Sequence, residues 1–277
     1  MRHVIVTWLV VALAVVAQPA RAASFDHEYR HYATLLAAHV RQGRVDYRGL
    51  VADRAALDAV VRQLGDVTAD DERAWTRAEQ IAYWVNAYNV FTLATIVQRY
   101  PIQGAWLSLS PRNSIRQIDG AWTRKDWAAA GARRSLDDIE HGIIRPRFSE
   151  PLVHAALNCA SVSCPLLAPE PYRAATLDGQ LEAAMRQYLA SPHGLVAAPG
   201  QLRVSSIFDW YGDDFVARYA PKDTPARQAR AAAVREVVRR YGPPAAVPVA
   251  TAPGVSVRFL SYDWSLNDVT SLPPPRR

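Results

Sequence analysis

Apolar and polar positions follow helical spacing along much of the N-terminal half of the chain. Residues 25–41, 53–64 and 70–99 carry apolar side chains at intervals of three and four, which predicts helices. In the third segment apolar residues occupy most sides. We therefore expect a buried central helix that ends before Pro101, because the residue preceding a proline avoids the helical region.

The second half combines helices with short strands. Residues 127–135 are typical of a hairpin with Gly131 in its turn, and Ser135 and Asp138 form a capping box. We expect the capped helix to stop before Pro146. The other predicted elements are helices over 177–189 and 226–241 and strands over 202–204 and 256–262. Helices with a small antiparallel sheet built from distant segments indicate an α+β fold.

The first residues predict export. A short basic start precedes an apolar run over residues 4–17, which is shorter than the roughly 20 residues that span a bilayer. Residues 20–22 form a small-x-small cleavage site, so we expect a signal peptide over 1–23. The mature chain, 24–277, is then a single domain in the periplasm or outside the cell, without a membrane span. An uncleaved anchor is the alternative.

Composition narrows the class further. Half of the 277 residues are apolar, so the chain can bury a core and is not disordered. The formal net charge is +6. The basic clusters have no interleaved stacking aromatics of the kind that single-strand binders use, so we interpret them as solvated faces and expect no nucleic-acid partner.

The only two cysteines, Cys159 and Cys164, leave three chemistries open. A close pair in an oxidising compartment ordinarily forms a disulfide that locks a turn. Alternatively, Cys159 is a thiolate nucleophile, because small neighbours leave room for a substrate and for backbone amides that bind an oxyanion. A zinc site with His141 and His154 is the third possibility, although the short-interval ligand pairs typical of zinc are missing.

Two further groups are candidates for chemistry. His141 lies on the capped helix and could take the proton of a thiol, although a lone helical histidine is more often structural. Asn86 and Asn89 lie three residues apart on the buried helix, where each unmet polar group costs about 1 to 3 kcal/mol. They either tie loops to the core or orient a catalytic imidazole or an oxyanion.

Four stretches together resemble the domain-of-unknown-function family 547: residues 79–93, 135–145, 154–165 and 262–268. Residues 45–47 and 205–215 resemble flanking parts of the same family. The resemblance implies that the marked positions of the family fall on Trp84, Asn86, Tyr88, Asn89, Glu140, His141, Gly142, His154, Asn158, Cys159, Ser163, Cys164 and Pro165. The family looks similar to papain-like and transglutaminase-like thiol enzymes, in which the nucleophile usually precedes the histidine. Here His141 precedes Cys159.

The leading hypothesis is a thiol-dependent hydrolase or acyl transferase that acts on an amide-type bond of a small-molecule or peptide-like substrate. Cys159 would be the nucleophile, His141 the base, and Asn86 or Asn158 the orienting or oxyanion group. Substrate contacts are expected at Trp84, Asn89, Glu140, His154 and Ser163. No cofactor or metal is expected. The alternatives are a non-catalytic binding or assembly module with a structural Cys159–Cys164 disulfide, and a zinc-binding protein.

Overall fold

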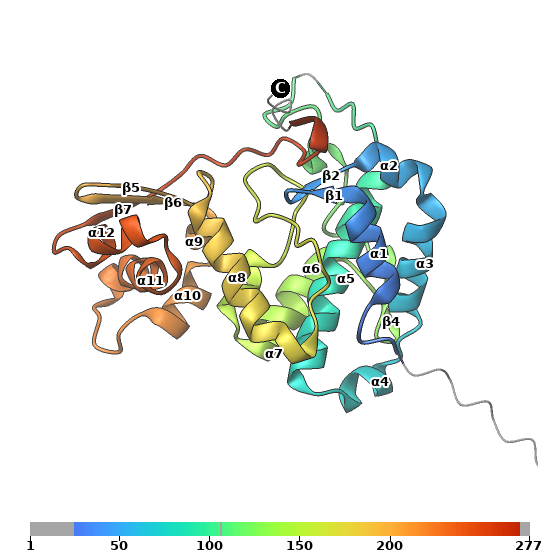
Figure 1. Ribbon diagram of the computed structural model, residues 1–277, viewed down its shortest axis with the longest axis horizontal. Coiled ribbons are helices and arrows are strands. Elements are labelled where there is room, and N and C mark those ends of the chain that lie inside the picture. Colours follow the sequence, from blue (N-terminus) through green and yellow to red (C-terminus); the bar gives the residue numbers. More distant parts are fainter. Residues whose placement is uncertain (1–24, 106, 272–277) are drawn as a thin grey trace, which may run out of the picture.

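The computed structural model describes residues 25–105 and 107–271. The predicted signal peptide, residues 1–23, lies outside these residues. Figure 1 shows two groups of elements, with helices α1 to α7 around the long helix α5 on one side and helices α10 to α12 with a small sheet on the other. The predicted α+β class is confirmed.

The N-terminal helices pack around α5. They are α1 (Arg30–His39), α2 (Tyr47–Ala52), α3 (Arg54–Gly65), α4 (Ala69–Ala74) and α5 (Arg77–Val97). From Ile81 to Val97 every residue of α5 is buried, which confirms the expected central helix. Capping boxes begin both α4, at Thr68, and α5, at Thr76, so the single helix predicted over 70–99 is in fact two helices.

The first helix is also shorter than its apolar pattern predicted. Tyr29 has a φ of 51°, in the left-handed region, so the helix begins only at Arg30. After His39 the chain turns into a two-stranded antiparallel ribbon formed by β1 (Val40–Arg41) and β2 (Arg44–Val45). Apolar spacing alone does not reveal such an end.

The predicted hairpin and capped helix are both present. Strands β3 (Trp127–Ala129) and β4 (Ala132–Arg134) pair antiparallel, and Ser135 begins α6 (Leu136–Ile139) through a capping box. The predicted stop before Pro146 is wrong. A π-helical turn over Glu140–Ile144, in which the Arg145 N–H bonds to the Glu140 carbonyl, widens the helix, and α7 (Arg145–Phe148) continues through the proline.

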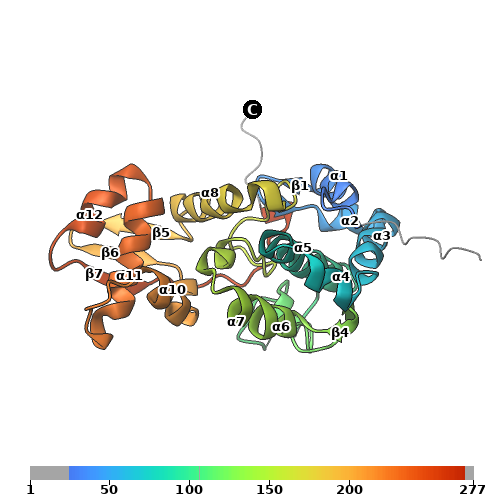
Figure 2. The same ribbon diagram turned by 90° about the horizontal axis from the view of Figure 1, so that it is seen from below.

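The C-terminal part contains the three-stranded sheet. Its elements are α8 (Leu177–Ala190), β5 (Leu195–Ala198), β6 (Gln201–Val204), α9 (Ile207–Trp210), α10 (Gly212–Tyr219), α11 (Ala226–Tyr241), α12 (Val247–Thr251) and β7 (Ser256–Phe259). Strand β5 is antiparallel to β6, whereas β7 joins β6 in parallel. Figure 2 shows α11 and α12 packed on this sheet, with α8 reaching toward the N-terminal helices.

After β7 the chain crosses back to the N-terminal part (Figure 1). The Asn267 N–H donates to the carbonyl of Ala160 at 3.1 Å, and the Asn267 carbonyl accepts from the Val45 N–H at 3.0 Å. The return brings residues 260–268 beside the cysteine loop. Within the described ranges, no helix is long and apolar enough to cross a membrane.

Candidate functional site

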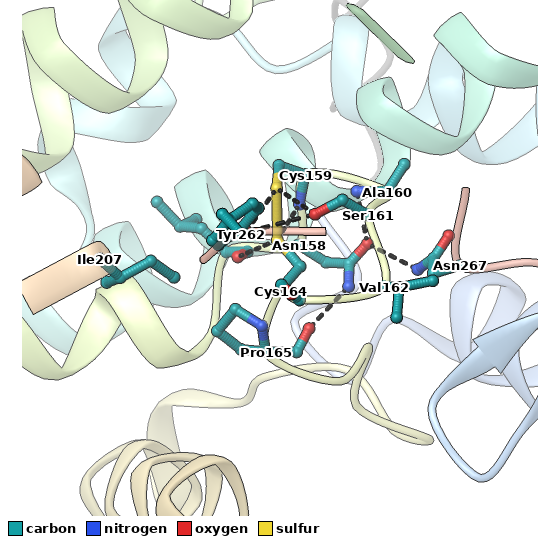
Figure 3. Close-up of a disulfide and its surroundings, with 12 residues drawn as sticks. Asn158, Cys159, Ala160, Ser161, Val162, Cys164, Pro165, Ile207, Tyr262 and Asn267 are labelled. Carbon is teal, nitrogen blue, oxygen red and sulfur yellow. Dashed lines mark hydrogen bonds between the residues drawn. A yellow bond between two sulfur atoms is a disulfide. The ribbon is translucent and has the colours of Figure 1, made fainter. Parts of the chain in front are cut away.

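The cysteine loop is held by a disulfide and by one asparagine. Cys159 and Cys164 are bonded to each other, as the disulfide alternative predicted (Figure 3). Inside the loop, the Asn158 side chain donates to the Pro165 carbonyl at 2.7 Å and accepts from the Ala160 N–H at 3.0 Å and from the Asn267 amide at 3.1 Å. Asn158 therefore fixes both the loop and the returning tail.

The two sulfur atoms differ in their surroundings. Cys164 is buried, whereas Cys159 is partly exposed. The Sγ of Cys159 lies 3.4 Å from the hydroxyls of both Ser161 and Tyr262, as Figure 3 shows. The Cys159 N–H donates to the Sγ of Cys164 at 2.9 Å. In this bonded state neither sulfur is a nucleophile or a thiolate ligand.

The partly exposed sulfur faces a cavity of about 540 Å³ between the two parts of the fold. This volume falls in the range of about 300 to 1,000 Å³ that is usual for small-molecule sites. The cavity is lined by Tyr88, Arg116, Trp122, Asp137, Glu140, His141, Arg145, His154, Leu157, Cys159, Cys164, Ile207, Trp210, Tyr211, Tyr262 and Trp264. Every segment that resembles the family, apart from residues 45–47, contributes to this lining.

Aromatic rings form one wall of the cavity. The rings of Trp210 and Trp264 stack with centroids 5.7 Å apart, and Tyr262 lies 4.7 Å from each of them. Trp122 meets Trp264 edge to face at 6.1 Å. Trp210 is 47% exposed, which is high for an indole, and it lies on the short helix α9. We call Trp210, Tyr262 and Trp264 the aromatic platform.

Charged and imidazole groups form a second part of the lining, which we call the charged wall, and Asp214 holds two of them. Arg145 binds Asp214 through two hydrogen bonds of 2.7 and 3.0 Å, and His154 Nε2 lies 2.8 Å from the same carboxylate. Burial would raise the pKa of Asp214, but the hydrogen bonds from His154 and Arg145 outweigh it and hold this pKa well below its usual range. Asp214 is therefore an anion that anchors both neighbours.

These contacts fix which imidazole nitrogen is available. A guanidinium can only donate, so the Nδ1 of His141, 3.0 Å from Arg145 Nη1, must be the acceptor. Because Asp214 is ionised, the Nε2 of His154 donates to it. The Nδ1 of His154 is buried and has no hydrogen-bond partner among the described residues. His154 thus keeps an acceptor nitrogen that makes no hydrogen bond among the described residues, whereas the acceptor nitrogen of His141 is used by Arg145.

Glu140 is buried beneath the cavity, at 5% exposure. Its Oε1 lies 3.9 Å from the Nδ1 of His154. Burial, and next the Glu140 carboxylate, raise the pKa of both Tyr88 and Tyr211. Both phenols therefore stay protonated and can donate to Glu140 or to a ligand. The Tyr211 ring stacks on His154 at 3.9 Å and covers it.

The predicted site residues divide into two sets. Cys159, His141, Glu140 and His154 line the cavity together. In the described part of the chain, the other predicted residues lie off this lining, with their polar groups bonded elsewhere: Asn86 to both backbone groups of Tyr172, Asn89 to Ala156 and Asn158, Trp84 to Glu72, Asn158 to Pro165, and Ser163 to His193 and Asp263.

Several groups in and beside the cavity were not among the predicted site residues. Trp210 ends α9, Tyr211 follows it, and Asp214 lies on α10 and binds lining residues, while Tyr262 and Trp264 come from the tail. The signal was present, since these positions lie in or beside stretches that resemble the family. Their role was not assigned because nothing local in the sequence places them beside Cys159.

Fold and site together define an α+β protein with an aromatic-walled cavity beside a disulfide loop. The model of the family described as "Protein of unknown function, DUF547" matches residues 73–189, so the resemblance to this family is confirmed over that region. The matched region includes α5, the π-helical turn and the cysteine loop, whereas the aromatic platform follows it. No curated protein and no solved structure matches the chain.

Among the described residues, no three His, Cys, Asp or Glu side chains are grouped so that they could hold a metal ion. The zinc hypothesis assigned Cys159 and Cys164 as ligands together with His141 and His154. Both sulfurs are used in the disulfide instead. All four residues do line the cavity, but the two histidines make their hydrogen bonds with Arg145 and Asp214.

Proposed function

We propose that the chain is a ligand-binding module, active outside the cytoplasm, whose cavity takes a small polar ligand against the aromatic platform. The observation that carries the proposal is the cavity itself, about 540 Å³, whose lining includes the half-exposed Trp210 and the buried Glu140. Sites of this kind combine apolar walls with a few polar groups that fix orientation. In this function the disulfide shapes the cavity and does no chemistry.

The disulfide also supports the proposed location, because such bonds persist in oxidising compartments. Signal-peptide cleavage near residue 22 or 23 would deliver the chain there. Mass spectrometry of the protein from its native host tests this part separately. We expect a mature chain that begins at Ala23 or Ser24, and an extracytoplasmic species that keeps Met1 would contradict it.

A fragment screen by ligand-observed NMR tests the binding function. We expect fragments that compete with one another and that lose binding in Trp264→Ala. Trp75→Ala is the matched control, because Trp75 is a partly buried indole that packs against Phe25, His27 and Tyr83, outside the cavity lining. Fragments that bind equally well to both variants, or no fragment binding at all, would refute the proposal.

A second candidate, the thiol-dependent hydrolase or acyl transferase, is favoured by one observation: Cys159 lines the same cavity as His154, whose Nδ1 is uncommitted. A dithiol reductant would first break the S–S bond, leaving two protein thiols and a reductant disulfide. The Cys159 thiol would then pass its proton to a base and attack the carbonyl carbon of an amide-type bond. The base would return the proton to the leaving amine, and water or an acceptor amine would release the acyl group from the sulfur. His154 suits this base better than His141, whose acceptor nitrogen is taken by Arg145.

Alkylation after reduction distinguishes the two functions. A nucleophile activated by His154 would make Cys159 of the reduced protein react with iodoacetamide at pH 7 well ahead of Cys164, and His154→Gln would slow Cys159 while leaving the rate of the buried Cys164 unchanged. A binding module predicts no such effect of His154→Gln. Site-resolved mass spectrometry measures both rates in one sample, so Cys164 serves as the internal control.

A further inference from the structure

The aromatic platform restricts the chemistry of the ligand that the cavity takes. An exposed indole face carries the negative side of the ring quadrupole and attracts cations, the C–H bonds of a saturated ring, or another flat ring. Trp210 is 47% exposed, and its ring is braced by Tyr262 and Trp264 at 4.7 and 5.7 Å. Three ligand classes therefore fit this wall: a cation, a saccharide or an aromatic compound.

The charges of the cavity disfavour an ionic ligand. Asp137 and Glu140 lie 4.0 and 3.9 Å from the imidazoles of His141 and His154, and Arg116 adds a guanidinium to the lining. The guanidinium of Arg145 is bound to Asp214. A charged ligand of either sign would therefore lose its water and meet a like charge as well as an opposite one, and this desolvation is costly.

Arg116 makes a cationic ligand still less favourable. Its guanidinium lies over the Trp264 ring, 5.1 Å from the centroid, so the platform already holds one positive group. An ammonium on the neighbouring Trp210 would be repelled by it. Arg116 also brings several N–H donors to the edge of the platform.

The polar groups around the platform combine donors and acceptors. Glu140 and Asp137 offer acceptor oxygens, Arg116 offers donors, and the hydroxyls of Tyr88 and Tyr211 can do either. An aromatic ligand would leave most of these groups unmet, whereas a ring that carries several hydroxyls can satisfy acceptors and donors at once. A sugar has this property together with an apolar C–H face.

We propose that the cavity binds a neutral saccharide, with one ring stacked on Trp210 and its hydroxyls bonded to Glu140, Asp137 and Arg116. This inference rests on the proposed binding function and names its ligand class. Because Trp210 is 47% exposed, the platform can take a short oligosaccharide, whose further rings would continue along Tyr262 and Trp264.

Isothermal titration calorimetry of the full mature chain with cellotriose and with the β-1,4-linked N-acetylglucosamine trisaccharide tests the inference. We expect at least one of them to bind, and Trp210→Ala to weaken it about tenfold, as loss of one stacked ring does at the upper end of its usual range. Trp75→Ala should leave the affinity within about twofold of the wild type. Trp210→Phe keeps a stacking ring and should restore part of the lost affinity.

Choline and indole serve as probes of the two rejected classes in the same titrations. If either binds and is weakened by Trp210→Ala while neither trisaccharide binds, the saccharide assignment is wrong and the proposed binding function stands. If no probe binds and the fragment screen also finds nothing in the cavity, both are wrong. Saccharide binding that Trp210→Ala leaves unchanged would overturn the assignment to this platform.

Discussion

Two buried polar groups of this protein, the asparagines of α5 and the cavity wall around Glu140 and His154, differ in how their hydrogen bonds are met. Asn86 and Asn89 use both their donors and their acceptors on backbone groups of distant segments. Among the described residues, the Nδ1 of His154 makes no hydrogen bond, and Glu140 lies 3.9 Å from it in the lining of the cavity. Buried polar side chains whose donors and acceptors are paired stabilise the fold. A polar group without a hydrogen bond beside a cavity is available to a ligand.

The largest stability effect is expected at the saturated asparagines. Asn89→Ala leaves the Asn158 N–H and the Ala156 carbonyl without their partner inside the core, so the free energy of unfolding should fall by about 3 kcal/mol. Urea unfolding of this variant measures the loss. Asn113→Ala, at an exposed position, should change stability by no more than about 0.5 kcal/mol. Similar values for the two variants would remove the distinction drawn here.

The disulfide comes next in expected size. Cys159→Ser and Cys164→Ser each open the same short loop, so each should lower the free energy of unfolding by about 2 kcal/mol, and the double variant should lose no more than either. Reductant should abolish the difference from the wild type. If Cys159→Ser proves much milder than Cys164→Ser under oxidising conditions, the bond contributes little and its structural role is wrong.

The charged wall should make stability depend on pH. The pKa of Asp214 is lowered by His154 and Arg145, so its stabilisation is present above the unfolded value of about 3.9 and disappears as the pH falls through the lower folded value. Asp214→Asn should cost on the order of 1 to 2 kcal/mol at pH 7, allowing for solvent screening, and progressively less as the pH falls below the unfolded value. Unfolding curves of both proteins between pH 2 and 7, in steps of about one unit, measure the difference. A difference in unfolding free energy between the two proteins that does not change with pH would contradict the conclusion that Asp214 is ionised.

The smallest stability effect is expected on the platform. Trp210 is half exposed, so Trp210→Ala should lower the free energy of unfolding by only about 1 kcal/mol, through the lost ring contacts with Tyr262 and Trp264, while its effect on ligand affinity is large. Calorimetric unfolding and ligand titration of the same sample compare the two effects. A loss of stability as large as that of Asn89→Ala would make Trp210 a core residue rather than a binding residue.

Much of the fold follows from local signals in the sequence. The hairpin around Gly131, the capping box at Ser135 and the bounds of α11 all depend on neighbouring residues, and all three predictions are confirmed. The split between α4 and α5 was missed even though the capping box at Thr76 is visible in the sequence. By contrast, no local pattern in the sequence predicts the π-helical turn before Pro146.

The site was predictable only in part, for the same reason. Cys159, Glu140, His141 and His154 lie within twenty residues of one another, and a search for chemistry finds them together. Asp214 reaches His154 across 60 positions of sequence, and Tyr262 reaches Cys159 across 103. Contacts at such separations are set by how α9, α10 and the tail pack, which the pattern of one chain does not specify.

The central claim is that the cavity between the two parts is a ligand site. A nitrogen-15 NMR titration with the saccharide or fragment that binds best tests it most directly, through the indole N–H signals of the tryptophans. The signals of Trp210 and Trp264 should shift together and saturate at one ligand per chain, while that of Trp75 stays in place. Shifts that spare Trp210 and Trp264, or that move Trp75 instead, would contradict it.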